Sequence, residues 1–211
     1  MYARRFLIST RLFFAAITTV AIAWQFVYGV LYQPTFNYVN FFSFFTILSN
    51  VFVTIVFVVS ALRLARGYKK LRPADDILRG ASVLYMIVTG IVYTLLLSGK
   101  DVGLTLPLVN LQLHFIMPLV VVFDWLYQPF AHKLQTRQTL WWMVFPAAYL
   151  VYSLLRGAAV GWYPYPFLNP ALAGGYIGVA LYCGGILLLL FIMSFVLLKL
   201  GDMVKLRRHV T

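Results

Sequence analysis

The sequence is dominated by long stretches without a charged residue, namely residues 12–62, 80–99, 102–123, 138–155 and 157–198. A helix needs about 20 apolar residues to cross the hydrocarbon core of a bilayer, and each stretch is close to that length or longer. With 63% hydrophobic and 10% charged residues, the chain also lacks the polar surface of a water-soluble domain. Patterning and composition therefore indicate a membrane protein and exclude a soluble globular fold.

Six membrane-spanning helices account for these stretches. The first stretch is long enough for two helices, and residues 33–37 supply a polar, proline-containing turn between them. The runs are continuously apolar rather than alternating, which favours helices over the strands of a membrane barrel. No internal repeat divides the chain, so we expect one all-α domain, residues 1–211. Its predicted helices cover residues 11–32, 41–62, 79–98, 107–127, 139–156 and 175–199.

The basic residues predict the orientation of these helices. In the six-helix arrangement, all Lys and Arg residues except Lys100 and Arg156 fall on one side, and basic residues favour the cytoplasmic side. We therefore expect a multi-pass protein of the cell membrane with both termini in the cytoplasm. A cleavable signal peptide is the alternative for the N-terminus, because Arg4 and Arg5 precede an apolar run.

The net charge of +12 bears on the expected partners. The basic residues flank hydrophobic spans rather than lining one face, so we expect anionic membrane lipid as a partner and no nucleic acid. The connector 63–78, which includes Asp75 and Asp76, is expected to be solvated. Only one histidine lies within a predicted span, so no metal or other cofactor is expected.

Two polar positions in the spans have the residue types of a nucleophile and its base. Thr46 belongs to a stripe of Ser43, Thr46, Asn50 and Thr54, whose spacing predicts one helical face. His114 precedes Pro118, which lacks an N–H and is expected to kink the helix beside the imidazole. Counted along their helices, Thr46 and His114 lie at matching depths, roughly 8–12 Å below the outer rim. This match favours a Thr–His pair over a purely structural role for each.

The segment 157–174 is uncharged, aromatic and proline-rich, unlike an ordinary exposed loop. Tyr and Trp favour the membrane interface, and the prolines restrict the backbone. We expect this segment to fold over the outer mouth of the bundle. Asp124 lies about 15 Å deeper than His114, so the sequence predicts a structural role for it rather than a catalytic one.

Three segments carry a resemblance to a known family. FFTILSN at 44–50, LHFIMP at 113–118 with Asp124-Trp125, and YPYPFLN at 163–169 together resemble the bacterial Pr-six-Pr integral membrane family. The pattern is also similar to the androgen-induced, FAR-17a-like membrane proteins. Animal members of that group hydrolyse fatty acid esters of hydroxy fatty acids with a threonine and a histidine. The resemblance implies Thr46 as nucleophile and His114 as base.

The leading hypothesis from the sequence is an intramembrane lipid ester hydrolase acting near the outer leaflet. Substrate-binding or oxyanion candidates are Asn50, Ser43, Tyr163 and Tyr165, and Arg156 is a candidate for holding a lipid carboxylate. The alternatives are a small transporter or channel and a lipid-binding protein without catalysis. Small residues at 174, 178, 180 and 184 permit close helix packing within one chain or between chains. A homo-oligomer is therefore one of the alternatives.

Overall fold

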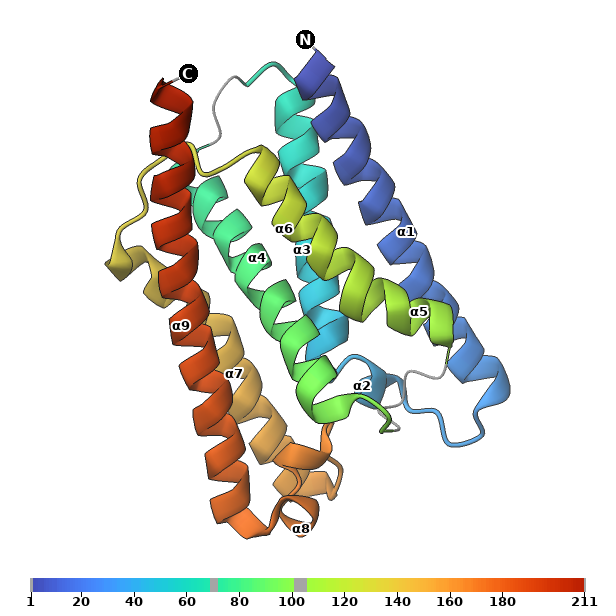
Figure 1. Cartoon of the computed structure of the whole chain (residues 1–211). Coiled ribbons are helices and arrows are strands. Elements are labelled where there is room, and N and C mark those ends of the chain that lie inside the picture. Colours follow the sequence, from blue (N-terminus) through green and yellow to red (C-terminus); the bar gives the residue numbers. More distant parts are fainter. Residues whose placement is uncertain (1, 69–71, 101–105, 211) are drawn as a thin grey trace.

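The computed structural model describes residues 2–68, 72–100 and 106–210, with side chains described as far as residue 203. These residues form helices and contain no strand (Figure 1). Two π-turns, η1 and η2, continue or interrupt longer helical segments, and η3 is a separate short 3₁₀-helix. In chain order the elements are α1 Tyr2–Tyr32, α2 Tyr38–Phe41, α3 Phe45–Ala65, α4 Pro73–Val92, η1 Tyr93–Leu97, α5 Pro107–Leu111, η2 Gln112–Ile116, α6 Met117–Tyr127, α7 Thr136–Val160, η3 Pro166–Leu168, α8 Pro170–Ala173 and α9 Gly175–Val210.

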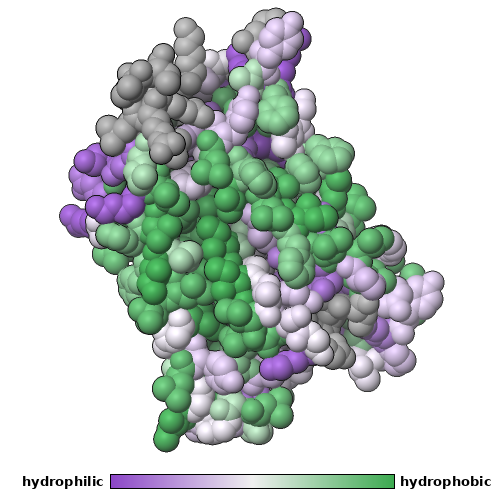
Figure 2. Space-filling view, in the orientation of Figure 1, coloured by the Kyte–Doolittle hydropathy of each residue, from purple (hydrophilic) through white to green (hydrophobic). Residues whose placement is uncertain are grey.

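Six of the helical units are long and apolar enough to cross a membrane: α1, α3, α4 with η1, α5 to α6, α7, and α9 up to Met203. The predicted all-helical class and the six spans are thereby confirmed for the described residues. Figure 2 shows mostly apolar side chains over the middle of the bundle and hydrophilic ones towards its ends, as a bilayer requires. The chain has the architecture of a multi-pass membrane protein.

Several helix ends differ from the prediction because helices continue past the apolar runs that define a span. α1 begins at Tyr2 instead of residue 11, and α9 continues to Val210. α3 differs in the other direction, since it begins at Phe45 and not at residue 41. The preceding residues form the separate short helix α2, which Asn37 caps by accepting a hydrogen bond from the Asn40 N–H.

Both chain ends lie at the same end of the bundle, which we call the terminal end (Figure 1). The opposite end, called the distal end, carries residues 33–44 and 161–174. Buried apolar side chains from the long helices fill the middle of the bundle. The core includes Phe57, Leu84, Met86, Met117 and Trp142.

α1 buries a polar side chain every seven residues against the α5 to α6 unit. Thr18 accepts a hydrogen bond from Gln112 Nε2 at 3.1 Å, and Gln25 accepts one from the backbone N–H that precedes α5. Arg11 is fully buried and donates to both carboxylate oxygens of Asp124, at 2.7 and 2.9 Å. Because an unpaired polar group is costly in an apolar environment, these four bonds fix the register of α1.

A buried ion-pair cluster occupies the terminal end of the bundle. The Asp124 carboxylate also accepts a hydrogen bond from the Arg79 guanidinium at 3.2 Å. The same guanidinium lies 3.8 Å from a carboxylate oxygen of Asp76. Asp76 in turn accepts two bonds from His132 at 2.8 Å, one from its backbone and one from its ring. The predicted solvated connector is therefore wrong at Asp75 and Asp76. Both belong to the first turn of α4 and are buried, Asp75 in a pair with Arg63.

Candidate active site

Thr46 lies in the first turn of α3, near the distal end of the bundle. Phe44 is the N-cap and offers no side-chain cap, so the N–H groups of the first turn point away from the helix without an intrahelical acceptor. The Thr46 side chain is buried, with 4% of the residue exposed. Its hydroxyl Oγ1 lies 3.1 Å from Nε2 of His114. The structure thus brings the two sequence-predicted residues into hydrogen-bond contact.

His114 lies in the middle of the π-turn η2, four residues before Pro118. The N–H of Met117 donates to the carbonyl of Gln112, five residues back, so this turn is wider than an α-helical turn. Pro118 cannot donate to the His114 carbonyl, which removes one of the bonds that would keep the segment α-helical. The sequence predicted a kink here, and the structure has a π-turn that directs the imidazole towards α3.

Asn50 joins α3 to this π-turn. Its Nδ2 group donates to the Thr46 carbonyl at 2.8 Å and to the Leu113 carbonyl at 3.2 Å. The second carbonyl is one that the π-turn leaves without its usual α-helical donor. Both Nδ2 hydrogens are therefore engaged in holding the backbone, which disfavours Asn50 as an oxyanion donor.

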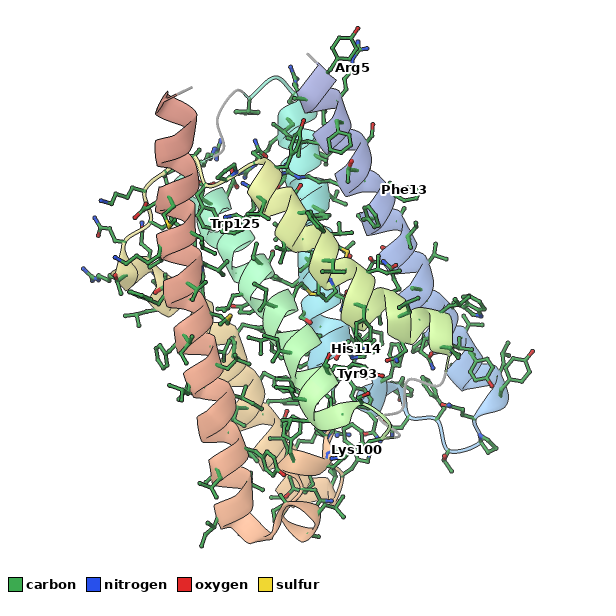
Figure 3. The ribbon with its side chains drawn as sticks, in the orientation of Figure 1. Arg5, Phe13, Tyr93, Lys100, His114 and Trp125 are labelled. Carbon is green, nitrogen blue, oxygen red and sulfur yellow. The ribbon has the colours of Figure 1, made fainter. Side chains whose placement is uncertain are left out.

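Two further residues hold the imidazole ring in place. Tyr93, at the start of η1, stacks on His114 with ring centroids 3.9 Å apart and an interplanar angle of 22° (Figure 3). His114 Nδ1 lies 3.2 Å from the Asn110 carbonyl, and the Asn110 side chain donates to the Tyr93 hydroxyl at 2.6 Å. Because a carbonyl can only accept, Nδ1 carries the proton. Nε2 is then unprotonated and free to accept the proton of the Thr46 hydroxyl.

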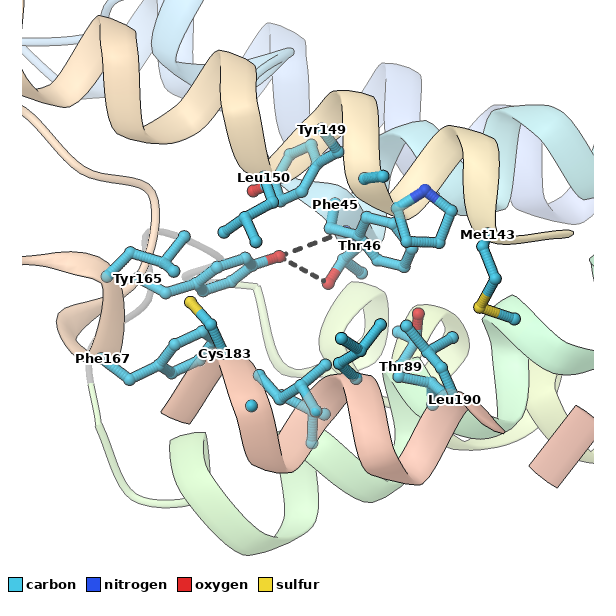
Figure 4. Close-up of a pocket in the computed structure, with 18 of the residues that line it drawn as sticks. Phe45, Thr46, Thr89, Met143, Tyr149, Leu150, Tyr165, Phe167, Cys183 and Leu190 are labelled. Carbon is cyan, nitrogen blue, oxygen red and sulfur yellow. Dashed lines mark hydrogen bonds between the residues drawn. The ribbon is translucent and has the colours of Figure 1, made fainter. Parts of the chain in front are cut away.

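Tyr165 completes the contacts of Thr46 from the distal segment. The Thr46 N–H donates to the Tyr165 hydroxyl at 3.2 Å, and the two hydroxyl oxygens lie 3.3 Å apart (Figure 4). Since the Thr46 hydroxyl donates to His114, the proton of this second contact comes from Tyr165. Burial raises the pKa of Tyr165, so its phenol stays protonated and remains a donor.

An apolar cavity of about 380 Å³ opens beside Thr46. Its walls come from α3, α4, η1, α7, η3 and α9. Figure 4 shows Thr46 between Phe167 on one side and Met143 and Leu190 on the other. The volume falls in the range of small-molecule sites, and the apolar walls suit a hydrocarbon ligand.

A second, more polar cleft of about 320 Å³ lies on the distal surface. Residues 33–44 form one side of it, and residues 162–172 form the other. Tyr165 lines both this cleft and the apolar cavity, so its ring separates them. Tyr163 lines only the cleft and packs against Gly157, where any Cβ would overlap the Tyr163 ring.

Ser43 does not face His114. Its hydroxyl donates to the Val39 carbonyl at 2.6 Å and lies 2.7 Å from the Tyr152 hydroxyl on α7. The expected stripe of polar residues fails at this position because α3 begins at Phe45, so helical spacing does not extend back to Ser43.

Arg156, the other sequence candidate, lies at the distal end of α7. It donates to the Asn40 side chain at 2.6 Å, and its guanidinium lies 5.0 Å from the centroid of the Trp162 ring. It thereby ties α7 to α2 and to the distal segment. The structure places it behind the wall of the distal cleft and not beside Thr46.

Sequence reasoning missed three parts of this site. Tyr93 has no signal in the sequence, whereas Asn110 has one, since it precedes His114 by four residues and so shares its helical face. The backbone N–H of Thr46 was missed because a helix starting at residue 41 would have used it internally. The later start of α3 leaves it free for another acceptor.

No protein family, curated protein or solved structure matches this chain.

Proposed function

We propose that the chain is an intramembrane lipid ester hydrolase with Thr46 as nucleophile and His114 as general base. The observation that carries the proposal is the 3.1 Å contact between Thr46 Oγ1 and the unprotonated Nε2 of His114. A hydroxyl is a weak nucleophile unless a base accepts its proton, and this contact supports the assignment because Nε2 lies within reach of the hydroxyl proton. The apolar cavity beside Thr46 supplies room for the hydrocarbon part of a lipid.

In the first half of the reaction, Thr46 Oγ1 attacks the ester carbonyl carbon while His114 Nε2 takes the hydroxyl proton. The tetrahedral oxyanion receives hydrogen bonds from the Thr46 N–H, which otherwise donates to Tyr165, and from the Tyr165 hydroxyl, which otherwise donates to Thr46 Oγ1. The uncapped start of α3 adds the positive end of a helix dipole. Collapse of the intermediate breaks the ester C–O bond, and the leaving alcohol takes the proton back from His114.

In the second half, water attacks the acyl group on Thr46. His114 accepts a proton from the water, and the same donors stabilise the second oxyanion. The carboxylic acid leaves, and Thr46 recovers its proton from His114. Asn110 and Tyr93 keep the imidazole in the required tautomer and plane, the role that a carboxylate has in a catalytic triad.

For the substrate and the orientation, the proposal follows the sequence. The resemblance to the androgen-induced hydrolases favours fatty acid esters of hydroxy fatty acids. The distribution of basic residues favours both termini in the cytoplasm and the site in the outer half of the cell membrane. A tag at residue 172, which is exposed on α8, would contradict this orientation if it reacted from the cytoplasmic side alone.

Turnover of a long-chain ester by the purified protein in lipid tests the function. Thr46→Ala and His114→Ala should each reduce hydrolysis to background, and the double variant should lose no more, because the two residues act as one unit. Thr46→Ser should retain part of the rate, since it keeps the hydroxyl. Thr54→Ala is the matched control on the same helix and should retain full turnover.

Two results would replace the proposal with its alternatives. Folded wild-type protein that binds the lipid without hydrolysing it would indicate a lipid-binding protein. Flux of a solute across proteoliposomes that depends on His114, again without hydrolysis, would indicate a transporter.

A further inference from the structure

The apolar cavity is not closed on the side where α7 and α9 face each other. Four residues line it and are nevertheless exposed on the surface of the bundle: Ala147 and Val151 on α7, and Gly184 and Leu187 on α9. All four belong to helices that are apolar enough to cross the membrane. The opening therefore faces the hydrocarbon of the bilayer and not water.

The cavity is elongated along the bundle. Its lining residues on α9 run from Cys183 to Leu190, which corresponds to about 10 Å of helix, and those on α7 run from Met143 to Val151, about 12 Å. These lengths match a linear chain better than a compact ring system.

Polarity is concentrated at one place on the cavity wall. The Tyr149 hydroxyl donates to the Ser43 carbonyl at 3.0 Å, and the Thr89 hydroxyl lies 3.3 Å from that of Ser49. Both are thus engaged with partners in the bundle. Thr46 and Tyr165 hydrogen-bond to each other at the cavity wall, and a ligand carbonyl can take the place of that contact. The expected ligand therefore has one carbonyl and a hydrocarbon remainder.

We propose that this cavity binds a single acyl chain, which enters sideways from the bilayer between α7 and α9, with Gly184 as the residue that keeps the portal open. The ester carbonyl lies at Thr46, and the chain extends towards Met143 and Leu190. The inference rests on the proposed function for the place of the carbonyl. The route of entry and the chain site are independent of whether hydrolysis follows.

Gly184 and its neighbour Gly185 provide a matched pair of positions. At each glycine an added Cβ would meet no atom within 4 Å, so the backbone accepts a side chain equally well at both positions. Gly184 lines the cavity and Gly185 does not. Gly184→Leu should therefore obstruct the portal, whereas Gly185→Leu adds the same side chain beside it.

The test is photo-crosslinking in lipid nanodiscs with a long-chain fatty acid ester that carries a diazirine at the end of its acyl chain. The Thr46→Ala background prevents hydrolysis, so binding is read separately from turnover. Mass spectrometry should locate adducts in the peptides of Met143 and Leu190, and excess unlabelled long-chain ester should suppress them. In that background Gly184→Leu should lower the yield about tenfold, as overpacking of a tight passage does, and Gly185→Leu should not.

Three outcomes would overturn the proposal. Adducts in residues 33–44 or 162–172 would place the chain in the distal cleft. Equal yields from the two leucine variants would show that the chain does not pass Gly184. Adducts that excess ester does not suppress would show only contact with bulk lipid. Specific adducts without turnover in the wild type would leave the chain site standing and remove the hydrolase proposal.

Discussion

Removing the hydroxyl of Tyr165 is the most informative single change in the site. In Tyr165→Phe the ring stays, stacked on Phe167 at 5.2 Å and edge-on to Phe44 at 5.7 Å, so the packing of the distal segment is retained. What is lost is the oxygen 3.2 Å from the Thr46 nitrogen and 3.3 Å from its hydroxyl. The variant therefore separates hydrogen bonding from packing.

Two effects of different size follow from this loss. Removing one oxyanion donor lowers kcat by about 10²–10³-fold in comparable sites. Because that bond forms in the transition state, KM should change little. The Thr46 N–H also loses its acceptor, which destabilises the folded protein by about 1–3 kcal/mol where the group is buried from water.

The assay is steady-state hydrolysis of a long-chain ester in lipid, together with thermal unfolding of the same preparation. Tyr182→Phe is the matched control, since this tyrosine lies beside Phe167 at 6.0 Å but does not line the cavity. It should keep wild-type kcat. A folded Tyr165→Phe protein with wild-type kcat would refute the role of Tyr165 as an oxyanion donor.

Three other changes test the contacts that support the site and the bundle. Tyr93→Leu removes the ring stacked on His114 and should lower kcat about tenfold to a hundredfold with little effect on thermal stability; unchanged kcat would contradict its positioning role. Asn50→Leu leaves the buried Leu113 carbonyl without this donor, whereas the Thr46 carbonyl keeps the Ser49 hydroxyl. The variant should therefore lower the free energy of unfolding by about 1–3 kcal/mol in thermal unfolding, and an unchanged melting temperature would show that water replaces the amide. Asp124→Leu leaves the Arg11 charge buried without its partner and should lower the free energy of unfolding by about 3–5 kcal/mol. The double variant Asp124→Leu with Arg11→Met should recover part of this stability, and no recovery would show that the pair is not the main source of the loss.

The sequence was sufficient for the number of spans because uncharged runs of membrane-crossing length are a direct physical requirement. It was also sufficient to choose Thr46 and His114 as a pair, because depth along a helix can be counted at a fixed rise per residue. The sequence could not predict that α1 begins at Tyr2, nine residues before Arg11. Charged residues end an apolar run without ending a helix.

The details that orient the site depend on contacts between helices far apart in sequence. Pro118 predicts a disturbance of its helix, but whether that disturbance is a kink or a π-turn depends on Asn50, which donates to the widened turn from α3. The start of α3 depends on a local competition, in which Asn37 caps α2 and delays the next helix to Phe45. That delay frees the Thr46 N–H for Tyr165.

The seven-residue spacing of Arg11, Thr18 and Gln25 is a signal that sequence reasoning could have used. Together they form one polar line on a helix, and such a line must face protein in a bilayer. Arg11 was interpreted only as a basic residue beside a span, so its pairing with Asp124 was not predicted. The buried cluster at the terminal end was missed for the same reason.

A covalent adduct on Thr46 is the most direct test of the proposed mechanism. Purified protein in lipid is treated with a lipophilic fluorophosphonate, digested and analysed by mass spectrometry. The account predicts an adduct on the hydroxyl of Thr46, slower labelling in His114→Ala because the base is missing, and none in Thr46→Ala. Folded wild-type protein that turns over no ester and carries no adduct at Thr46 would contradict it.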